Sequence, residues 1–123
     1  MALPIYLPVT LWGDGFQRRE LIYIDDVVKI ITELSNLNNQ IVNLGTGNDN
    51  TIREFAELVS KNIGFDASKI VYDTTKYTGC KVKILDPNKL ISLMSTDFKF
   101  TSLESGIKNI VEYYNDQIQK KYD

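Results

Sequence analysis

The fold of this chain is decided by residues 12–26, which read WGDGFQRRELIYIDD. Gly13 and Gly15 tolerate a positive φ, and Asp14 between them can close a turn through its own carboxylate. Two arginines follow, and the apolar run 21–24 then predicts a strand buried inside a covered sheet. Asp25 or Asp26 predicts the cap of a helix. A cation fixed at the end of a buried strand can hold a phosphate, so this stretch is the first candidate for a binding site.

The rest of the chain alternates short strands with helices. Residues 9–12, 41–44 and 69–73 predict strands, and residues 81–85 predict an extended segment. Thr51 and Glu54 have the spacing of a capping box at the start of a helix that Gly64 ends. Asp86 and Pro87 predict the start of a short helix, and a long final helix begins near residues 101–102. The pattern predicts an α/β fold with few short strands and about four helices.

Length and composition restrict the possible functions. The 123 residues, of which 43% are hydrophobic, fit one domain with one core. The net charge of -2 provides no general attraction to nucleic acid or to an anionic membrane, so any phosphate site must be local. Because the chain contains no histidine, histidine-based triads and histidine-ligated metal sites are excluded, and we expect no metal site.

The chain carries no signal for export or membrane insertion. No apolar run reaches the length of a membrane span, and residues 1–8 lack the pattern of a signal peptide. The single cysteine, Cys80, cannot form an internal disulfide, and a cytoplasmic location is the default expectation. We interpret residues 1–8 as a boundary segment or a cloning remnant, and residues 9–123 as the domain.

Two further patterns invite a catalytic interpretation and are disfavoured. The loop 45–47, Gly-Thr-Gly, lies between a predicted strand and a helix, as in dinucleotide-binding folds, but Asn50 replaces the third glycine. A tight turn into a capped helix is the favoured interpretation. The Tyr-Lys spacing of a proton-transfer pair occurs twice, at residues 72 and 76 and at residues 77 and 81. Both pairs fall outside the predicted helices. In an extended chain, side chains four residues apart are too far from each other to act together.

Several short segments, taken together, form a recognisable series. These segments are residues 12–15 (WGDG), 18–20 (RRE), 25–26 (DD), 43–47 (NLGTG), 51–54 (TIRE), 73–76 (DTTK) and 102–106 (SLESG). Their order and spacing resemble the C-terminal half of the extended short-chain dehydrogenase/reductases, the NAD-dependent epimerase/dehydratase family, and most of all its GDP-L-fucose synthase branch.

The resemblance implies a small C-terminal substrate-binding domain without a complete Rossmann domain. It implies that Arg19 contacts the diphosphate of a GDP-sugar, while Trp12 and Lys83 border the nucleotide. The alternative is that Arg19 is a solvated cation at a strand end and that Trp12 is a core residue. The complete enzyme would use NADP, and this chain would supply no catalytic or cofactor-binding residue. It would therefore be inactive without an N-terminal cofactor domain.

The sequence departs from the GDP-L-fucose synthase pattern at two positions. Thr78 stands where an aspartate is usual, and Val82 stands where several members carry an arginine. The missing acid leaves open a UDP- or dTDP-sugar epimerase or dehydratase. A third reading is a non-enzymatic α/β interaction module. Apolar surface left exposed where a missing half would dock predicts self-association, and hence a homo-oligomer.

Overall fold

A computed structural model of the chain describes residues 8–122. Four α-helices are present in this range: α1 (Ile24–Glu33), α2 (Ile52–Ile63), α3 (Asn88–Leu93) and α4 (Leu103–Tyr122). They are accompanied by five short strands and a 3-10 turn, η1 (Ala67–Lys69). The prediction of an α/β fold with few short strands and about four helices is confirmed. The boundary segment proposed for residues 1–8 falls almost entirely outside the described residues.

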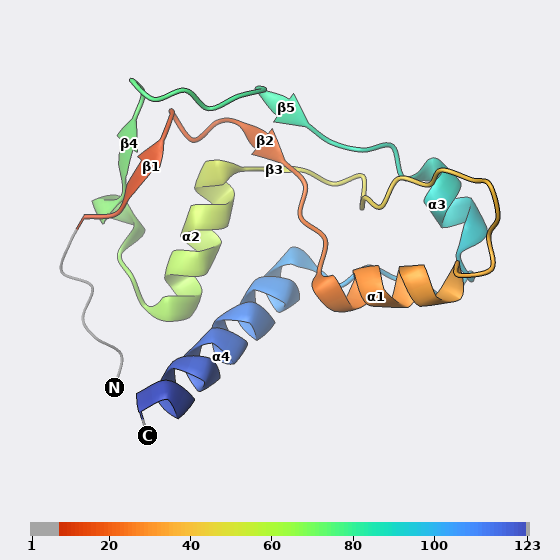
Figure 1. Cartoon of the computed structure of the whole chain (residues 1–123). Helices are drawn as coiled ribbons and strands as arrows, with labels where there is room; N and C mark the ends of the chain where they lie inside the picture. Colours follow the sequence, from red (N-terminus) through yellow and green to blue (C-terminus); the bar gives the residue numbers. More distant parts are fainter. Residues whose placement is uncertain (1–7, 123) are drawn as a thin grey trace.

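The strands form two small sheets. β1 (Thr10–Trp12) pairs in parallel with β4 (Val71–Asp73). β2 (Arg18–Arg19) lies between β3 (Asn50–Thr51), to which it is antiparallel, and β5 (Val82–Lys83), to which it is parallel. The 13–17 turn therefore links the two sheets, because it leaves β1 and enters β2 (Figure 1).

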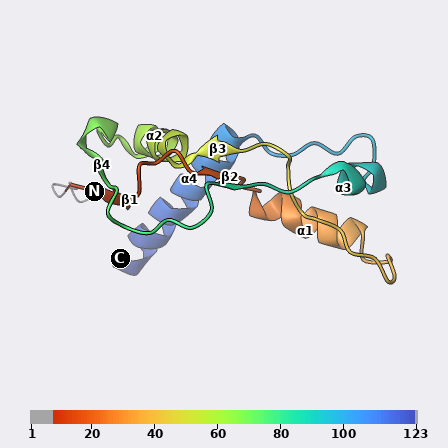
Figure 2. The ribbon, with the colours of Figure 1, turned by 90° about the horizontal axis from the view of Figure 1, so that it is seen from above.

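The elements follow one another along an elongated molecule (Figure 1). α1 and α3 lie at one end, while β1, β4 and η1 lie at the other, with α2 and α4 packed together between them (Figures 1 and 2). The buried core cluster lies between α1 and α3 and contains Ile30, Leu90 and Met94. Ile107 of α4 is also buried, at 8% exposure. None of the helices within residues 8–122 combines the length and the apolar character that a bilayer crossing requires.

Two predicted strands are absent from the structure. Residues 21–23 belong to no strand, and Ile24 begins α1 instead. Residues 41–44 likewise lack a ladder partner, and Ile41 is 88% exposed. The apolar composition of both segments predicted strands, but a strand requires a neighbouring strand to complete its hydrogen bonds. Nothing within the described residues supplies that neighbour.

The predicted caps divide into one confirmed and one wrong. Thr51 and Glu54 form the expected reciprocal capping box, and Gly64 ends α2 in the left-handed conformation at φ 72°. Neither Asp25 nor Asp26 caps α1, whose N-cap is Tyr23. The Asp26 carboxylate instead accepts hydrogen bonds from the backbone N–H (2.7 Å) and hydroxyl (3.0 Å) of Thr101, and so ties α1 to the segment that leads into α4.

Candidate functional site

The turn between the two sheets is closed by its own backbone and by one carboxylate. Gly13 and Gly15 have φ of 86° and 78°, and the Asp14 carboxylate accepts a hydrogen bond from the Phe16 backbone N–H at 2.8 Å. Gly13 also donates to the carbonyl of Asp73 at 2.7 Å. A Cβ added to Gly13 would lie 2.2 Å from the Gln17 side chain. The two glycines are therefore needed for conformation and for space, as the sequence predicted.

Arg53 of α2 holds this turn through contacts with two aromatic rings and one backbone carbonyl. Its guanidinium carbon lies 3.9 Å from the ring centre of Tyr72 and 4.6 Å from that of Phe16. Its Nε donates to the carbonyl of Asp14 at 2.7 Å. These cation–π contacts and the hydrogen bond join α2 to β4 and to the 13–17 turn. This role of Arg53 was not predicted from the sequence, because the two aromatic residues are distant from it along the chain.

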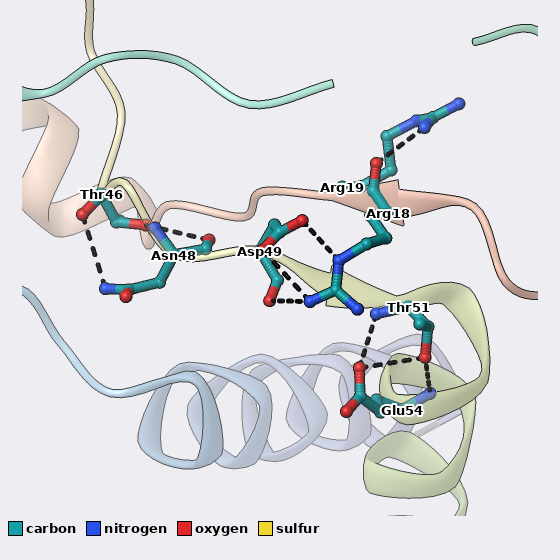
Figure 3. A network of polar contacts seen from close by, with 7 residues as sticks. All are labelled: Arg18, Arg19, Thr46, Asn48, Asp49, Thr51 and Glu54. Atoms are coloured by element: carbon teal, nitrogen blue, oxygen red, sulfur yellow. Dashed lines mark hydrogen bonds and ion pairs between the residues drawn. The ribbon is translucent and has the colours of Figure 1, made fainter. Parts of the chain in front are cut away.

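The two arginines of β2 point to opposite faces of the strand, as successive strand residues must (Figure 3). Arg18 forms an ion pair with Asp49, with Nε 2.6 Å from Oδ2 and Nη2 3.2 Å from Oδ1. The hydrogen bond from Arg18 lowers the pKa of the Asp49 carboxyl, and the same contact raises the pKa of Arg18. Arg18 is thus occupied with holding the loop before β3.

Arg19 lies on the other face of β2, beside Lys83. Its Nη1 donates to the carbonyl of Arg18 at 2.8 Å, and its Nη2 lies 3.4 Å from the carbonyl of Thr78. The register of the parallel strands places Arg19 directly opposite Lys83, so both side chains leave the same face. Among residues 8–122, neither cation has an ion-pair partner. The structure therefore brings together two of the three predicted site residues.

Trp12, the third predicted residue, belongs to the other sheet. It is the last residue of β1, lies opposite Asp73 of β4 and is 63% exposed. The alternative that Trp12 fills the core is therefore wrong.

A cavity of about 380 Å³ opens beside the 13–17 turn. Trp12, Arg19 and Lys83 are not among the residues that line it. It is lined by the 13–17 turn and by the loop from β4 to β5, and it contains the side chains of Lys76, Thr78 and Lys81. Thr78 is the residue whose carbonyl contacts Arg19. Gln17 also lines this cavity, is 7% exposed, and has a carboxamide oxygen without a hydrogen-bond partner. From the sequence, Lys76 was assigned to a Tyr-Lys spacing and to the 73–76 segment of the family resemblance, and Lys81 to a Tyr-Lys spacing; neither was predicted to line a cavity.

The Gly45–Gly47 loop does not fit a pyrophosphate. The Glu20 carboxylate already accepts a hydrogen bond from the Gly47 backbone N–H at 2.7 Å and lies 3.4 Å from the Thr46 hydroxyl. A carboxylate at that place would repel the phosphates of a dinucleotide. The loop is a tight turn, as the sequence favoured.

The two Tyr-Lys spacings also lie outside any helix. Tyr72 is in β4 beneath Arg53, and Tyr77 is 89% exposed in the following loop. Within residues 8–122 no cluster of three or more metal-ligating side chains occurs. Within the described residues, the geometry therefore places two cations, Arg19 and Lys83, on one strand face and places neither Tyr-Lys spacing on a helix.

The chain was compared with known proteins. Residues 2–45 match the model of a family described as the NAD dependent epimerase/dehydratase family. Over 110 residues the chain is 37% identical to GDP-L-fucose synthase 1 of Arabidopsis thaliana, a match that covers 86% of this chain and 32% of the relative. The chain spans about a third of the length of the curated relatives that it matches.

Solved structures share the fold. A GDP-L-fucose synthetase from Naegleria fowleri bound to NADP superposes with a TM-score of 0.82 at 20% identity, covering 89% of this chain and 35% of that one. A UDP-glucose 4-epimerase from Thermotoga maritima, solved with UDP-glucose, has a TM-score of 0.79 at 30% identity, with coverage of 89% and 35%. The resemblance read from the sequence is confirmed.

Proposed function

Because the chain is related to the NAD dependent epimerase/dehydratase family, we propose that it is the nucleotide-sugar-binding part of a GDP-sugar epimerase/reductase resembling GDP-L-fucose synthase. In this proposal Arg19 and Lys83 hold the nucleotide diphosphate, and Trp12 borders the nucleotide. A residue range covering only a third of the relatives leaves room for a further domain, which we propose is N-terminal and binds NADP. This chain would then bind the substrate, while the other domain would carry out hydride and proton transfer.

The observation that supports the proposal most strongly is the pairing of Arg19 with Lys83. Like charges directly opposite each other on neighbouring strands repel, so their juxtaposition costs stability unless an anion lies between them. A diphosphate would supply that anion, and the fork of Arg19 can bind it through two parallel hydrogen bonds. The two carbonyls that accept from Arg19 hold its guanidinium on this face of β2.

Titration with GDP, UDP and dTDP tests the proposal. Trp12 is the only tryptophan of the chain, so its fluorescence reports binding at the proposed site. We expect a saturable change with GDP that weakens about tenfold to a hundredfold in Arg19→Ala and in Lys83→Ala, the range for one charge-assisted hydrogen bond. Lys108→Ala on α4 is the control, because Lys108 is exposed and pairs only with Glu112.

The outcomes separate the proposed functions. Equal affinity for GDP in wild type and Arg19→Ala would overturn the assignment of the diphosphate site. Absence of binding by all three nucleotides would leave the non-enzymatic α/β interaction module as the better reading.

A second candidate function is a UDP- or dTDP-sugar epimerase or dehydratase. Of the two solved structures described above, the UDP-glucose 4-epimerase is the more similar in sequence, at 30% identity against 20%. Thr78 also lacks the acid that the GDP-L-fucose synthase pattern carries. A preference for UDP or dTDP over GDP, with the same dependence on Arg19, would favour this candidate.

A further inference from the structure

The start of α2 is fixed to the turn that links the two sheets. β3 leads directly into α2, so Arg53 is the second residue after a strand of the three-stranded sheet (Figure 1). The backbone N–H of Ile52 donates to the carbonyl of Gln17 at 3.1 Å, and that of Arg53 donates to the carbonyl of Gly15 at 3.0 Å. A helix start leaves such N–H groups without partners inside the helix, and here the turn supplies the partners.

The side chain of Arg53 contacts both the turn and the two-stranded sheet. Its guanidinium carbon lies 3.9 Å from the ring centre of Tyr72 in β4, and its Nε donates to the carbonyl of Asp14 at 2.7 Å. A Cβ added to Gly15 would lie 2.5 Å from the Tyr72 ring and 2.7 Å from Arg53 Cγ, so the turn packs directly on both side chains. Arg53 therefore connects the end of β3 to β4.

The two sheets carry different parts of the proposed nucleotide site. Trp12 ends β1 and lies opposite Asp73, the residue after Tyr72. Arg19 and Lys83 lie opposite each other in the three-stranded sheet. The indole and the two cations can contact one nucleotide only if the two sheets keep a fixed separation and angle. Because Trp12 is 63% exposed, its position depends on how the two-stranded sheet is held.

We propose that Arg53 is a positioning residue for nucleotide binding. By holding β4 against the turn and the start of α2, it fixes the place of Trp12 relative to Arg19 and Lys83. The inference rests on the proposed function, because it takes the nucleotide as the ligand that both sheets contact. Arg53 acts through the placement of Trp12, since its guanidinium is already engaged by two rings and by the carbonyl of Asp14.

Calorimetric titration with GDP and with pyrophosphate tests this inference. GDP contacts both sheets, whereas pyrophosphate needs only Arg19 and Lys83. We expect Arg53→Met to weaken GDP binding about tenfold, the range of one base–aromatic stacking contact, and to change pyrophosphate binding less than about twofold. Arg18→Met is the matched control, because the ion pair of Arg18 with Asp49 stays beside the three-stranded sheet. It should leave both affinities within about twofold of wild type.

A double-mutant cycle identifies the residue through which Arg53 acts. Trp12→Ala should weaken GDP binding about tenfold, and the double variant of Trp12→Ala with Arg53→Met should bind GDP no more weakly than Trp12→Ala alone. Arg53→Lys keeps a cation over the rings and should lose less GDP affinity than Arg53→Met. If circular dichroism shows that Arg53→Met is unfolded, Arg53→Lys takes its place in the titrations and in the cycle.

Four results would overturn the inference. The first is unchanged GDP affinity in the Arg53 variant, and the second is an equal loss of GDP and pyrophosphate affinity, which would assign Arg53 to the fold as a whole. The third is additive losses in the cycle with Trp12, and the fourth is a GDP-selective loss in Arg18→Met. Failure of the proposed function is distinguishable, because a wild-type chain that binds neither ligand refutes the nucleotide site itself.

Discussion

Two regions of the molecule differ in how their groups are paired. One is the polar end, formed by the 13–17 turn, the two sheets and the start of α2. The other is the open edge, formed by residues 41–44 and the exposed Ile24, Val28 and Ile31 of α1. At the polar end Arg18 is paired with Asp49, Thr51 with Glu54, and Arg53 with two aromatic rings. At the open edge, no strand of the part of the chain that the structure describes pairs with residues 41–44, and the apolar side chains of Ile24, Val28 and Ile31 on α1 are exposed. The two regions therefore leave different kinds of group without a partner.

Within residues 8–122, the unpaired charges at the polar end include the cations Arg19 and Lys83, while the open edge has exposed apolar side chains and main-chain N–H groups that donate no hydrogen bond. Cations in register on one strand face fit a small anion, which can enter and leave. The two regions therefore differ in what they leave uncompensated: positive charge at the polar end and apolar surface at the open edge. The predictions below test that division.

The largest effect is expected from the core beneath the open edge. Leu90 is 1% exposed and packs with Ile30 and Met94, so Leu90→Ala should lower the free energy of unfolding by about 2–5 kcal/mol. Urea denaturation measures the change. The neighbouring Ile91, at 56% exposure, is the matched control, and Ile91→Ala should cost less than about 1 kcal/mol. Equal losses would mean that α3 does not anchor this end of the molecule.

A smaller loss is expected at the loop that leads from the open edge to the polar end. Gly47 has φ 75°, and an added Cβ would lie 2.7 Å from the Pro87 ring. Gly47→Ala should therefore lower the free energy of unfolding by about 1–2 kcal/mol. Gly106→Ala is the control of opposite sign, because Gly106 lies within α4 and its nearest neighbour, Tyr23, would be at an ordinary 3.5 Å. That variant should stabilise the chain by about 0.5–1 kcal/mol.

The sequence predicted the locally determined features and missed those that depend on partners. The capping box at Thr51, the stop at Gly64 and the turn glycines were recognised because each signal lies within a few residues. Residues 21–24 and 41–44 were misread because strand formation depends on a second strand. Asp26 was misread as a cap because its real partner, Thr101, is distant in the chain.

For the candidate site, too, the sequence predicted a local motif but not the contacts that depend on strand pairing. Arg19 could be chosen from its motif, but the sequence does not state which arginine of β2 is already occupied. That depends on Asp49 lying on the Arg18 face. The register of Arg19 with Lys83, and the place of Trp12 on the other sheet, are consequences of strand pairing that spacing cannot reveal.

The capping box at the start of α2 stabilises the polar end through local hydrogen bonds between Thr51 and Glu54. The Thr51 hydroxyl accepts from the Glu54 backbone N–H at 3.1 Å, and the Glu54 carboxylate accepts from the Thr51 backbone N–H at 2.6 Å. Thr51→Ala should lower the free energy of unfolding by about 1 kcal/mol, measured in urea, and Thr51→Ser should recover most of it because the hydroxyl returns. A serine variant as unstable as the alanine variant would show that the methyl group matters more than the cap.

The smallest effect concerns acid, and it distinguishes a paired arginine from a free one. Hydrogen bonding to Arg18 lowers the pKa of Asp49 from its ordinary value of 3.8, so unfolding takes up a proton as the pH falls toward that value. The stabilisation is complete above the unfolded-state pKa and is lost as the pH falls through the lowered folded-state pKa. Asp49→Asn and Arg18→Met should therefore lose stability at pH 6 and show a flatter decline in acid than wild type. Because the pair is partly exposed, 1 M salt should reduce the stability difference between wild type and these two variants.

Arg19→Met is the control. It removes a cation without an ion-pair partner in residues 8–122, and it should keep the acid profile of wild type. Matching profiles for the Arg18 and Arg19 variants would contradict the division of labour between the two faces of β2.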